Sequence, residues 1–452
     1  MQKIMNKHSN FKCLSLNKIL IVFFLLFLFC GKSLSAQQEE SEYTLTQLVD
    51  SALHKNNLLQ AHEKNTMIKQ AELEILKKNY QPTISTSASI STWKFLLPNK
   101  QRVLGDALTD VYTDISVRQT IYDGGENKAN KSMVEEEILL NDVVYKQIQN
   151  TIIWGVSDVY FEILKAEREV EAQINSLEQL KSQLQYAETL HKRGKVSKVD
   201  ILKIKVQMSV LEKNLQKARN SGKAQNIKLK RLCYLENNEE IKIEKVADSL
   251  YQTWQNHFFS YDLLYAEAQQ NHPALAATRH LMEMEKMQKE IYRSQSMPKV
   301  FTYGVGSWEH GYIPFGDNFN YNIGVGVSYT IPFFGGSSHK NKIHQSNLQV
   351  EQMEDEKEQD FQDIKEEIDI TLNEIRDIQS EISNNEEIME LADETLKNAL
   401  VKYRGGQGTI VDVLDAQTIL TEATIVRHKS ILAYLQTIAK LHYITGNNDY
   451  PF

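Results

Sequence analysis

The sequence has little cysteine and, beyond its first 36 residues, no long hydrophobic run. Only three of the 452 residues are cysteine. Cys13 and Cys30 lie within the first 36 residues, so Cys233 is alone in the rest of the chain and an intrachain disulfide is excluded there. No stretch of 18 apolar residues follows residue 36, which excludes a membrane-spanning helix in that part of the sequence.

Motifs for catalysis and for metal binding are also missing. The sequence contains no H-E-x-x-H, no Walker loop and no G-x-S-x-G. The twelve histidines are scattered, and the pair His339 and His344 lacks the spacing of metal ligands. The glycines of "YGVGSW" and "IGVGVS" fall in strand patterns rather than in a phosphate-binding loop. We therefore expect no catalytic residue, no cofactor and no metal site, and hence no enzyme.

The N-terminal residues have the three-part pattern of a secretory signal peptide. Four lysines between Lys3 and Lys18 precede the apolar run "ILIVFFLLFLF", and the small residues of "SLSAQQ" follow. The pattern predicts a signal peptide over 1–36, cleaved near Ala36. Two alternatives stay open. The run could remain as a membrane anchor, or Cys30 could carry a lipid, although the bulky Phe29 before it is unusual for a lipoprotein signal.

The charge balance argues against a nucleic-acid partner. The formal net charge is -8, and loss of the leader removes five lysines and no acidic residue, which leaves -13. Nucleic-acid binding depends on cationic side chains that replace the counterions of phosphates. We expect no nucleic acid among the partners.

The chain repeats one pattern of elements twice. We expect a signal peptide over 1–36, a first structural repeat over 37–235, an equatorial linker over 236–260, a second repeat over 261–446 and a C-terminal tail over 447–452. Each repeat is expected to contain a helix of moderate length, two strands, a very long helix and a return helix. The moderate helices begin at Leu45 and Tyr261.

The strand segments alternate with a period of two. Pro82 and Pro298 open the first strand of each repeat, since proline suits the start of a strand. "PTISTSASISTW", "VYTDISVRQTI", "VFTYGVGSW" and "YNIGVGVSYTI" each have one apolar face opposite small or polar residues; in the third, Phe301, Tyr303 and Val305 fall together. Such strands, about 9–11 residues long, can cross a membrane. A soluble sandwich also alternates, but four strands cannot close a barrel, so other chains must complete the sheet.

A Gly-Gly pair follows the strands of each repeat. Gly124 and Gly125 precede a helical pattern over about 126–190, and Gly335 and Gly336 precede one over about 337–403. Each of these helices would be roughly 100 Å long, which exceeds any compact domain of this size. Return helices are predicted over about 197–235 and 409–446. A moderate helix and a return helix placed end to end nearly match the long helix in length.

The two turns between a long helix and its return helix share the pattern G-x-x-[ST]-x-x-D. The copies are Gly194, Ser197, Asp200 and, 212 positions later, Gly406, Thr409, Asp412. Glycine permits the left-handed conformation that ends a helix, and the hydroxyl caps the next helix. The aspartate then sits at the third helical position, where the helix dipole favours a carboxylate.

The duplicated order of helix, strand pair, Gly-Gly, long helix and G-x-x-[ST]-x-x-D turn, ending in "GTIVDVLDAQ", resembles the TolC family of outer-membrane efflux channels over essentially the whole mature chain. The resemblance implies a mainly α fold with transmembrane β-strands. Three chains would form a homotrimer whose long helical hairpins build a periplasmic α-barrel, and whose four strands per chain build one 12-stranded β-barrel in outer-membrane lipid. It also implies a periplasmic adaptor protein and an inner-membrane pump of RND or ABC type as partners.

The resemblance implies roles for the tip residues. Adaptor docking falls on Gly194, Ser197, Gly406 and Thr409, and a periplasmic gate falls on Asp200, Tyr403, Asp412 and Asp415. The sequence departs from the best-known family pattern at Gly408, where an arginine that pairs with the aspartates is usual. Arg404 and Lys198 are the candidates to replace it. A purely structural role for Asp412, capping its helix, stays open beside the gating role.

The function implied is a passive exit duct of a tripartite efflux pump or type I secretion system, in the outer membrane of a diderm bacterium. An exported coiled-coil scaffold or adhesin without a pore is the alternative. The alternating strands favour the duct, because a scaffold has no reason to keep four apolar strand faces. A periplasmic adaptor would have a single hairpin, whereas this chain is duplicated.

Overall fold

The computed structural model describes residues 42–94, 107–235, 241–244, 247–310, 318–329 and 336–447. The predicted signal peptide with Cys30 and Ala36 lies outside the described residues, as does Gly335. No described helix is long and apolar enough to cross a membrane.

The same order of elements occurs twice along the described chain. The first half contains α2 (Leu45–Lys55), α3 (Asn57–Lys77), β1 (Thr83–Lys94), β2 (Ala107–Tyr122), α5 (Glu126–Lys192) and α6 (Lys198–Leu232). After α7 (Ala247–Trp254), the second half contains α8 (Tyr261–Asn271), α9 (Pro273–Ser294), β3 (Lys299–His310), β4 (Asn318–Ser328), α10 (Gly336–Arg404) and α11 (Ile410–Thr445). The mainly helical fold with four strands and two very long helices, of 67 and 69 residues, is confirmed.

The expectation of one moderate helix per half is wrong, because each half has two. At the first break, the Asn56 side chain accepts hydrogen bonds from the backbone N–H groups of Leu58 and Leu59, at 2.8 and 3.2 Å, and so caps α3. At the second break, Pro273 occupies the first turn of α9, where its missing N–H costs no helical hydrogen bond. Each break lets the chain change direction beside the long helices.

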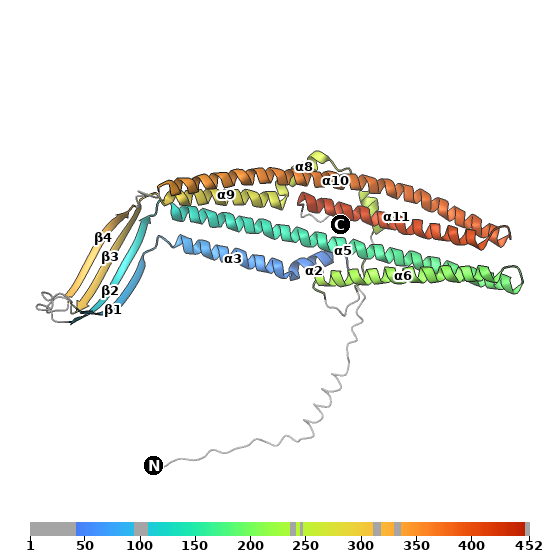
Figure 1. The fold of residues 1–452 in the computed structure, drawn as a ribbon, viewed down its shortest axis with the longest axis horizontal. Helices are drawn as coiled ribbons and strands as arrows, with labels where there is room; N and C mark the ends of the chain where they lie inside the picture. The colour runs from blue at the N-terminus through green and yellow to red at the C-terminus, as the bar shows by residue number, and fades with distance from the viewer. Residues whose placement is uncertain are drawn as a thin grey trace, which may run out of the picture. The chain divides into compact units, whose positions relative to one another are not determined.

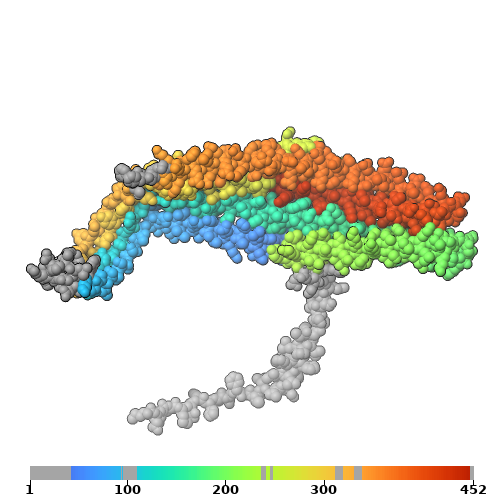
Figure 2. Space-filling model, viewed as in Figure 1, coloured from blue at the N-terminus to red at the C-terminus, as the bar shows by residue number. Residues whose placement is uncertain are grey.

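The long helices act as the spines of two helical hairpins. α5 packs against α6, and α10 against α11, while α11 also packs along α5 and so joins the two hairpins (Figure 1). α3 and α6 lie end to end along α5, as the lengths in the sequence suggested (Figure 2). Where α2 meets the end of α6, the Ser51 hydroxyl donates to the backbone oxygen of Cys233 at 2.9 Å.

The larger hydrophobic core lies where α2, α5, α10 and α11 meet, at the level of the linker helix α7. Tyr160 and Tyr434 are fully buried there. Each hydroxyl donates a hydrogen bond to a backbone oxygen of the linker region: Tyr160 to Glu244 at 3.0 Å, and Tyr434 to Trp254 at 2.9 Å. Buried tyrosines need such partners, so these two bonds tie the linker to the long hairpins.

The four strands form one antiparallel sheet in the order β1-β2-β3-β4 (Figure 1). Ile84 lies opposite Val117, Val117 opposite Gly304, and Gly304 opposite Ile323, so all four share one side of the sheet. This side is apolar and uncovered in the single chain: Ile90 is 76% exposed and Ile323 78%. β1 and β4 are the two edges of the sheet.

The interpretation of four equivalent apolar strand faces is wrong for β3. Its apolar set lies on the opposite, polar side of the sheet, because Tyr303 pairs with Arg118 of β2 and with Gly324 of β4. The apolar side of β3 is completed instead by small residues such as Gly304 and Gly306. Alternation reveals which residues share a side, but only the pairing register reveals which side that is.

Candidate functional site

The ends of the two long helices have the same backbone geometry. Gly194, after α5, has a φ of 70°, and its N–H donates to the His191 oxygen at 2.9 Å, while the next N–H reaches back to Leu190 at 3.0 Å. Gly406, after α10, repeats both bonds with a φ of 74°. This is a Schellman ending, which satisfies the last carbonyl groups of a helix and requires left-handed backbone at glycine.

The return helices begin with matched capping boxes. The hydroxyl of Ser197 accepts the backbone N–H of Asp200 at 3.2 Å, and the Asp200 carboxylate accepts the Ser197 N–H at 3.2 Å. Thr409 and Asp412 make the same two bonds at 3.3 and 2.9 Å. The predicted caps of both return helices are confirmed, so both aspartates have a structural task within their own chain.

A second hydrophobic cluster lies directly behind the tips and holds the two hairpins together. Leu180 of α5, Ile204 of α6 and Val413 of α11 are fully buried in it. A polar contact spans the two return helices further along, where the Gln207 side chain donates to the Thr418 hydroxyl at 2.9 Å. The tips are therefore parts of one packed end and not two separate loops.

Tyr403 lies at the end of α10 and packs against this cluster. Its hydroxyl is enclosed and has no hydrogen-bond partner among the described residues. Burial, followed by the nearby carboxylate of Asp200, raises the pKa of Tyr403 above its usual value. Tyr403 and Asp200, which the sequence placed in one gate, are thus brought together across the two hairpins.

Asp412 and Asp415 are both exposed on α11. Hydrogen bonds from the Thr409 backbone and hydroxyl, with a smaller contribution from the charge of Lys402, lower the pKa of Asp412. Within the described chain neither Arg404 nor Lys198 forms an ion pair with these aspartates. The cation that acts on Asp412 is Lys402, which the sequence did not indicate.

Gly408 leaves little room for a side chain. A Cβ atom there would lie 3.1 Å from the Cβ of Lys402 and 3.1 Å from the backbone nitrogen of Tyr403. An arginine at this position would require the end of α10 to shift. The absence of the usual arginine thus agrees with the local packing.

A groove of about 620 Å³ runs beside the tips between α5 and α10. Tyr186 and Gln183 line it from α5, and Tyr403 and Arg404 from α10. The Lys397 ammonium pairs with Asp393 at 2.5 Å on one wall. The groove offers aromatic rings and side chains of both signs of charge.

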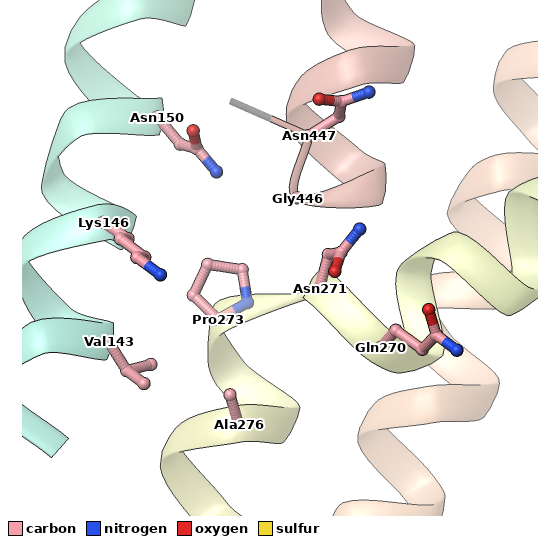
Figure 3. Close-up of a pocket in the computed structure, with 9 residues that line it drawn as sticks. All are labelled: Val143, Lys146, Asn150, Gln270, Asn271, Pro273, Ala276, Gly446 and Asn447. Carbon is pink, nitrogen blue, oxygen red and sulfur yellow. The ribbon is translucent and has the colours of Figure 1, made fainter. Parts of the chain in front are cut away.

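A polar pocket of about 280 Å³ lies near the middle of the helices, between α5, the break before α9 and the end of α11 (Figure 3). Lys146 and Asn150 line it from α5, and Gln270 and Asn271 from α8. No group of three side chains able to hold a metal ion occurs in the described ranges. The pocket offers hydrogen bonds and one positive charge.

The junction between β2 and α5 has a polar network that sequence reasoning missed. The Tyr80 hydroxyl donates to Asp123 at 2.8 Å, and the Asp123 carboxylate also accepts the backbone N–H groups of Gly125 at 3.0 Å and Asn127 at 2.9 Å. Gly124, with a φ of 77°, approaches the Ser294 oxygen so closely that a Cβ would lie 2.8 Å from it. In the sequence, Asp123, directly before the Gly-Gly pair, could have indicated this network.

The other predicted junction residues lie at element boundaries. Pro82 and Pro298 immediately precede β1 and β3, and Gly336 begins α10. Gly125 precedes α5 with a φ of 91°.

Comparison with known proteins gives one family. The model of the outer membrane efflux protein family matches residues 48–233 and 264–447, one segment in each half. The outer membrane efflux protein BepC of Brucella suis biovar 1 is 22% identical over 403 residues, which cover 88% of this chain and 84% of that protein.

Solved channel structures have the same fold at low sequence identity. CusC superposes with a TM-score of 0.77 at 15% identity, over 89% of this chain and 92% of that one. VceC of Vibrio cholerae gives 0.73 at 16%, over 89% and 96%, and CmeC of Campylobacter jejuni gives 0.72 at 16%, over 89% and 86%. The match of the family model to both halves places this chain in the outer membrane efflux protein family, and the protein is an exit duct of the outer membrane.

Proposed function

We propose that the duct is a homotrimer that receives its cargo from a periplasmic adaptor and an inner-membrane pump of RND or ABC type, and that its periplasmic tip is a gate. The observation that carries the proposal is the sheet. One side of it is apolar and exposed, and both edge strands, β1 and β4, lack a neighbour among the described residues. Lipid tolerates no open edge, so β4 of one chain would pair with β1 of the next.

The helices support a ring as well. α3 and α10 lie on opposite sides of α5 (Figure 1), and each has exposed apolar side chains at the end near the strands, among them Met67 at 65% on α3 and Leu348 at 50% on α10. Two different surfaces that pair head to tail form a closed ring when the rotation between neighbours closes. The coiled-coil scaffold without a pore gives no reason for the exposed apolar side of the sheet.

The adaptor would dock at the tip turns. Gly194, Ser197, Gly406 and Thr409 form two matched, hydrogen-bonded turns on one packed end, and the groove between α5 and α10 lies beside them. A pair of similar turns suits a partner that contacts each subunit twice.

The gate would consist of Asp200, Tyr403, Asp412 and Asp415. Repeated three times, Asp412 and Asp415 would form acidic rings that attract cations and repel one another as the passage narrows. The enclosed hydroxyl of Tyr403 lacks a hydrogen-bond partner within the described chain, and the carboxylate of Asp200 is the charge near it. Substitution of Asp415 tests the acidic ring more directly, because substitution of Asp412 also removes a cap of α11.

Single-channel recording of the purified full chain in a planar bilayer tests this function. We expect small cation-selective currents from the native protein, with larger and less selective currents from Asp415→Ala and from the double change Asp412→Ala, Asp415→Ala. Thr409→Ala is the matched control, since it removes the hydroxyl of the cap and keeps both charges.

The outcomes separate the parts of the proposal. Unchanged conductance and selectivity in Asp415→Ala would refute the acidic gate but leave the duct. A monomer that gives no current would instead favour the scaffold without a pore.

A further inference from the structure

The register of the sheet assigns one side to the pore. In an outer-membrane duct the apolar side, with Ile84, Ile115 and Ile323, faces lipid. The other side, on which Ser85, Ser116 and Asn322 lie, then faces the lumen. The inference that follows rests on the proposed duct.

Two aromatic side chains on β3 break the polar character of the lumen side. Phe301 lies opposite Gly326, and Tyr303 lies opposite Gly324. A Cβ on Gly326 would lie 2.5 Å from the Phe301 ring, and one on Gly324 would lie 2.8 Å from the Tyr303 hydroxyl. The rings therefore lie flat across the glycines of β4, and they present an aromatic surface to the lumen.

Arg118 of β2 lies on this aromatic surface. It pairs in register with Tyr303, and its guanidinium carbon sits 4.1 Å from the centre of the Phe301 ring. Arg118 forms no ion pair with any carboxylate in the described part of the chain. β2 is an inner strand, so the neighbours of Arg118 on both sides come from its own subunit. Its charge is exposed, oriented by stacking and not neutralised.

We propose that Arg118, stacked on Phe301, determines selectivity in the barrel: three copies form a basic collar that binds organic anions transiently as they pass. A guanidinium donates two parallel hydrogen bonds to a carboxylate or a sulfonate, and the neighbouring ring of Tyr303 adds affinity for an aromatic group. The preferred solutes are therefore aromatic anions. The collar lies in the barrel, whereas the proposed acidic gate lies at the helical tips.

The test measures the reversal potential in a salt gradient, and the block of current by 2-naphthalenesulfonate, for single channels of the full chain. Arg118→Gln removes the charge, Arg118→Lys keeps it without the planar group, and Phe301→Leu removes the stacking platform. Ser85→Gln, on the same side of the sheet, is the control for added bulk in the lumen.

We expect Arg118→Gln to make the channel more cation-selective and to weaken the block roughly two- to fivefold. Arg118→Lys should keep the selectivity and lose part of the block, and Phe301→Leu should also weaken the block. Unchanged reversal potential and block in Arg118→Gln would overturn the collar while the duct stands. Absence of current from the native protein would overturn the duct, and the collar with it.

Discussion

The Asp412 carboxylate accepts hydrogen bonds from both the backbone N–H and the hydroxyl of Thr409, at 2.9 and 2.8 Å. These bonds make the Asp412 carboxylate part of the capping box at the first turn of α11. Asp415 forms no hydrogen bond of this kind among the described residues. The two aspartates, three positions apart, therefore differ in their hydrogen bonds, and substitutions at Asp412 change structure as well as charge.

Acid should loosen the first turn of α11. The folded pKa of Asp412 is lowered by its bonds to Thr409, so its contribution to stability is present above the ordinary value of 3.8 and is lost as the pH falls through the lower folded value. We expect the amide protection factor of Leu414 to drop below about pH 4 in the native protein. In Asp412→Asn it should already be low at neutral pH and stay flat. A protection factor that falls equally in both proteins would contradict this assignment.

Removal of the Thr409 hydroxyl should weaken the tip. Thr409→Ala loses the cap of α11 and should lower the free energy of unfolding of this end by about 0.5–2 kcal/mol. Thr395→Ala is the matched control, because among the described residues that hydroxyl bonds only to the Leu391 oxygen of its own helix, and Thr395 is exposed. Hydrogen exchange across the first turn of α11 measures the stability of this end in both variants. Equal effects from the two substitutions would show that the Thr409 hydroxyl does not stabilise the tip as a helix cap.

Tyr80 should titrate well above an ordinary tyrosine. Burial, followed by its hydrogen bond to Asp123, raises the pKa of Tyr80 to about 12. Its contribution to stability is therefore complete below the ordinary value of 10.0 and is lost as the pH rises through the folded value. The difference in ultraviolet absorbance between the native protein and Tyr80→Phe should show a single phenol ionising near 12. In Asp123→Asn this ionisation should move to lower pH, and a Tyr80 that ionises near 10 in the native protein would refute the network.

Tyr234 follows α6 with a φ of 54°, the left-handed backbone that glycine prefers. Gly446 holds the equivalent place after α11, with a φ of 72°. Tyr234→Gly relieves this strain and Tyr234→Ala does not, so the glycine variant should be more stable than the alanine variant by about 1 kcal/mol. Urea unfolding of the two variants gives the difference.

The reverse change should be worse. In Gly446→Ala the new Cβ would lie 2.8 Å from the Asn271 oxygen, so strain and a clash combine. We expect Gly446→Ala to lower the free energy of unfolding by more than the difference between Tyr234→Gly and Tyr234→Ala, and urea unfolding measures it. An alanine at 446 without effect would show that the end of α11 yields easily.

The sequence allowed the helix boundaries to be predicted where a local cause fixes them. Gly125 starts α5 because glycine adopts a positive φ, and Thr409 starts α11 because its hydroxyl caps the helix. Each cause lies within four residues of the helix start, so a short stretch of sequence is enough to predict it. The break at Asn56 has a local cause too, but asparagine occurs in helices often enough that its cap is not decisive. Pro273 was the clearer signal, and the prediction of one continuous helix overlooked it.

Other features depend on residues far apart in the chain. The side of the sheet on which Phe301 lies is set by pairing with Thr120 of β2, 181 residues earlier in the sequence, so alternation alone could not predict it. The bond between Tyr80 and Asp123 joins two elements across a strand pair. For the tip, the positions of the turns could be predicted from the G-x-x-[ST]-x-x-D pattern, whereas the roles of Asp200, Tyr403, Asp412 and Asp415 in gating remain predictions.

The glycines beneath the β3 rings have a consequence for the width of the passage. A ring that stands upright from a barrel wall narrows the bore by its full length, whereas Phe301 and Tyr303 lie against Gly326 and Gly324 and occupy the depth that side chains of β4 would otherwise fill. The two rings thus extend less far from the wall than upright rings would, which leaves room for the Arg118 guanidinium that lies on Phe301. The aromatic surface therefore narrows the bore less than upright rings would. A larger residue at 324 or 326 would push the rings away from the wall and narrow the bore.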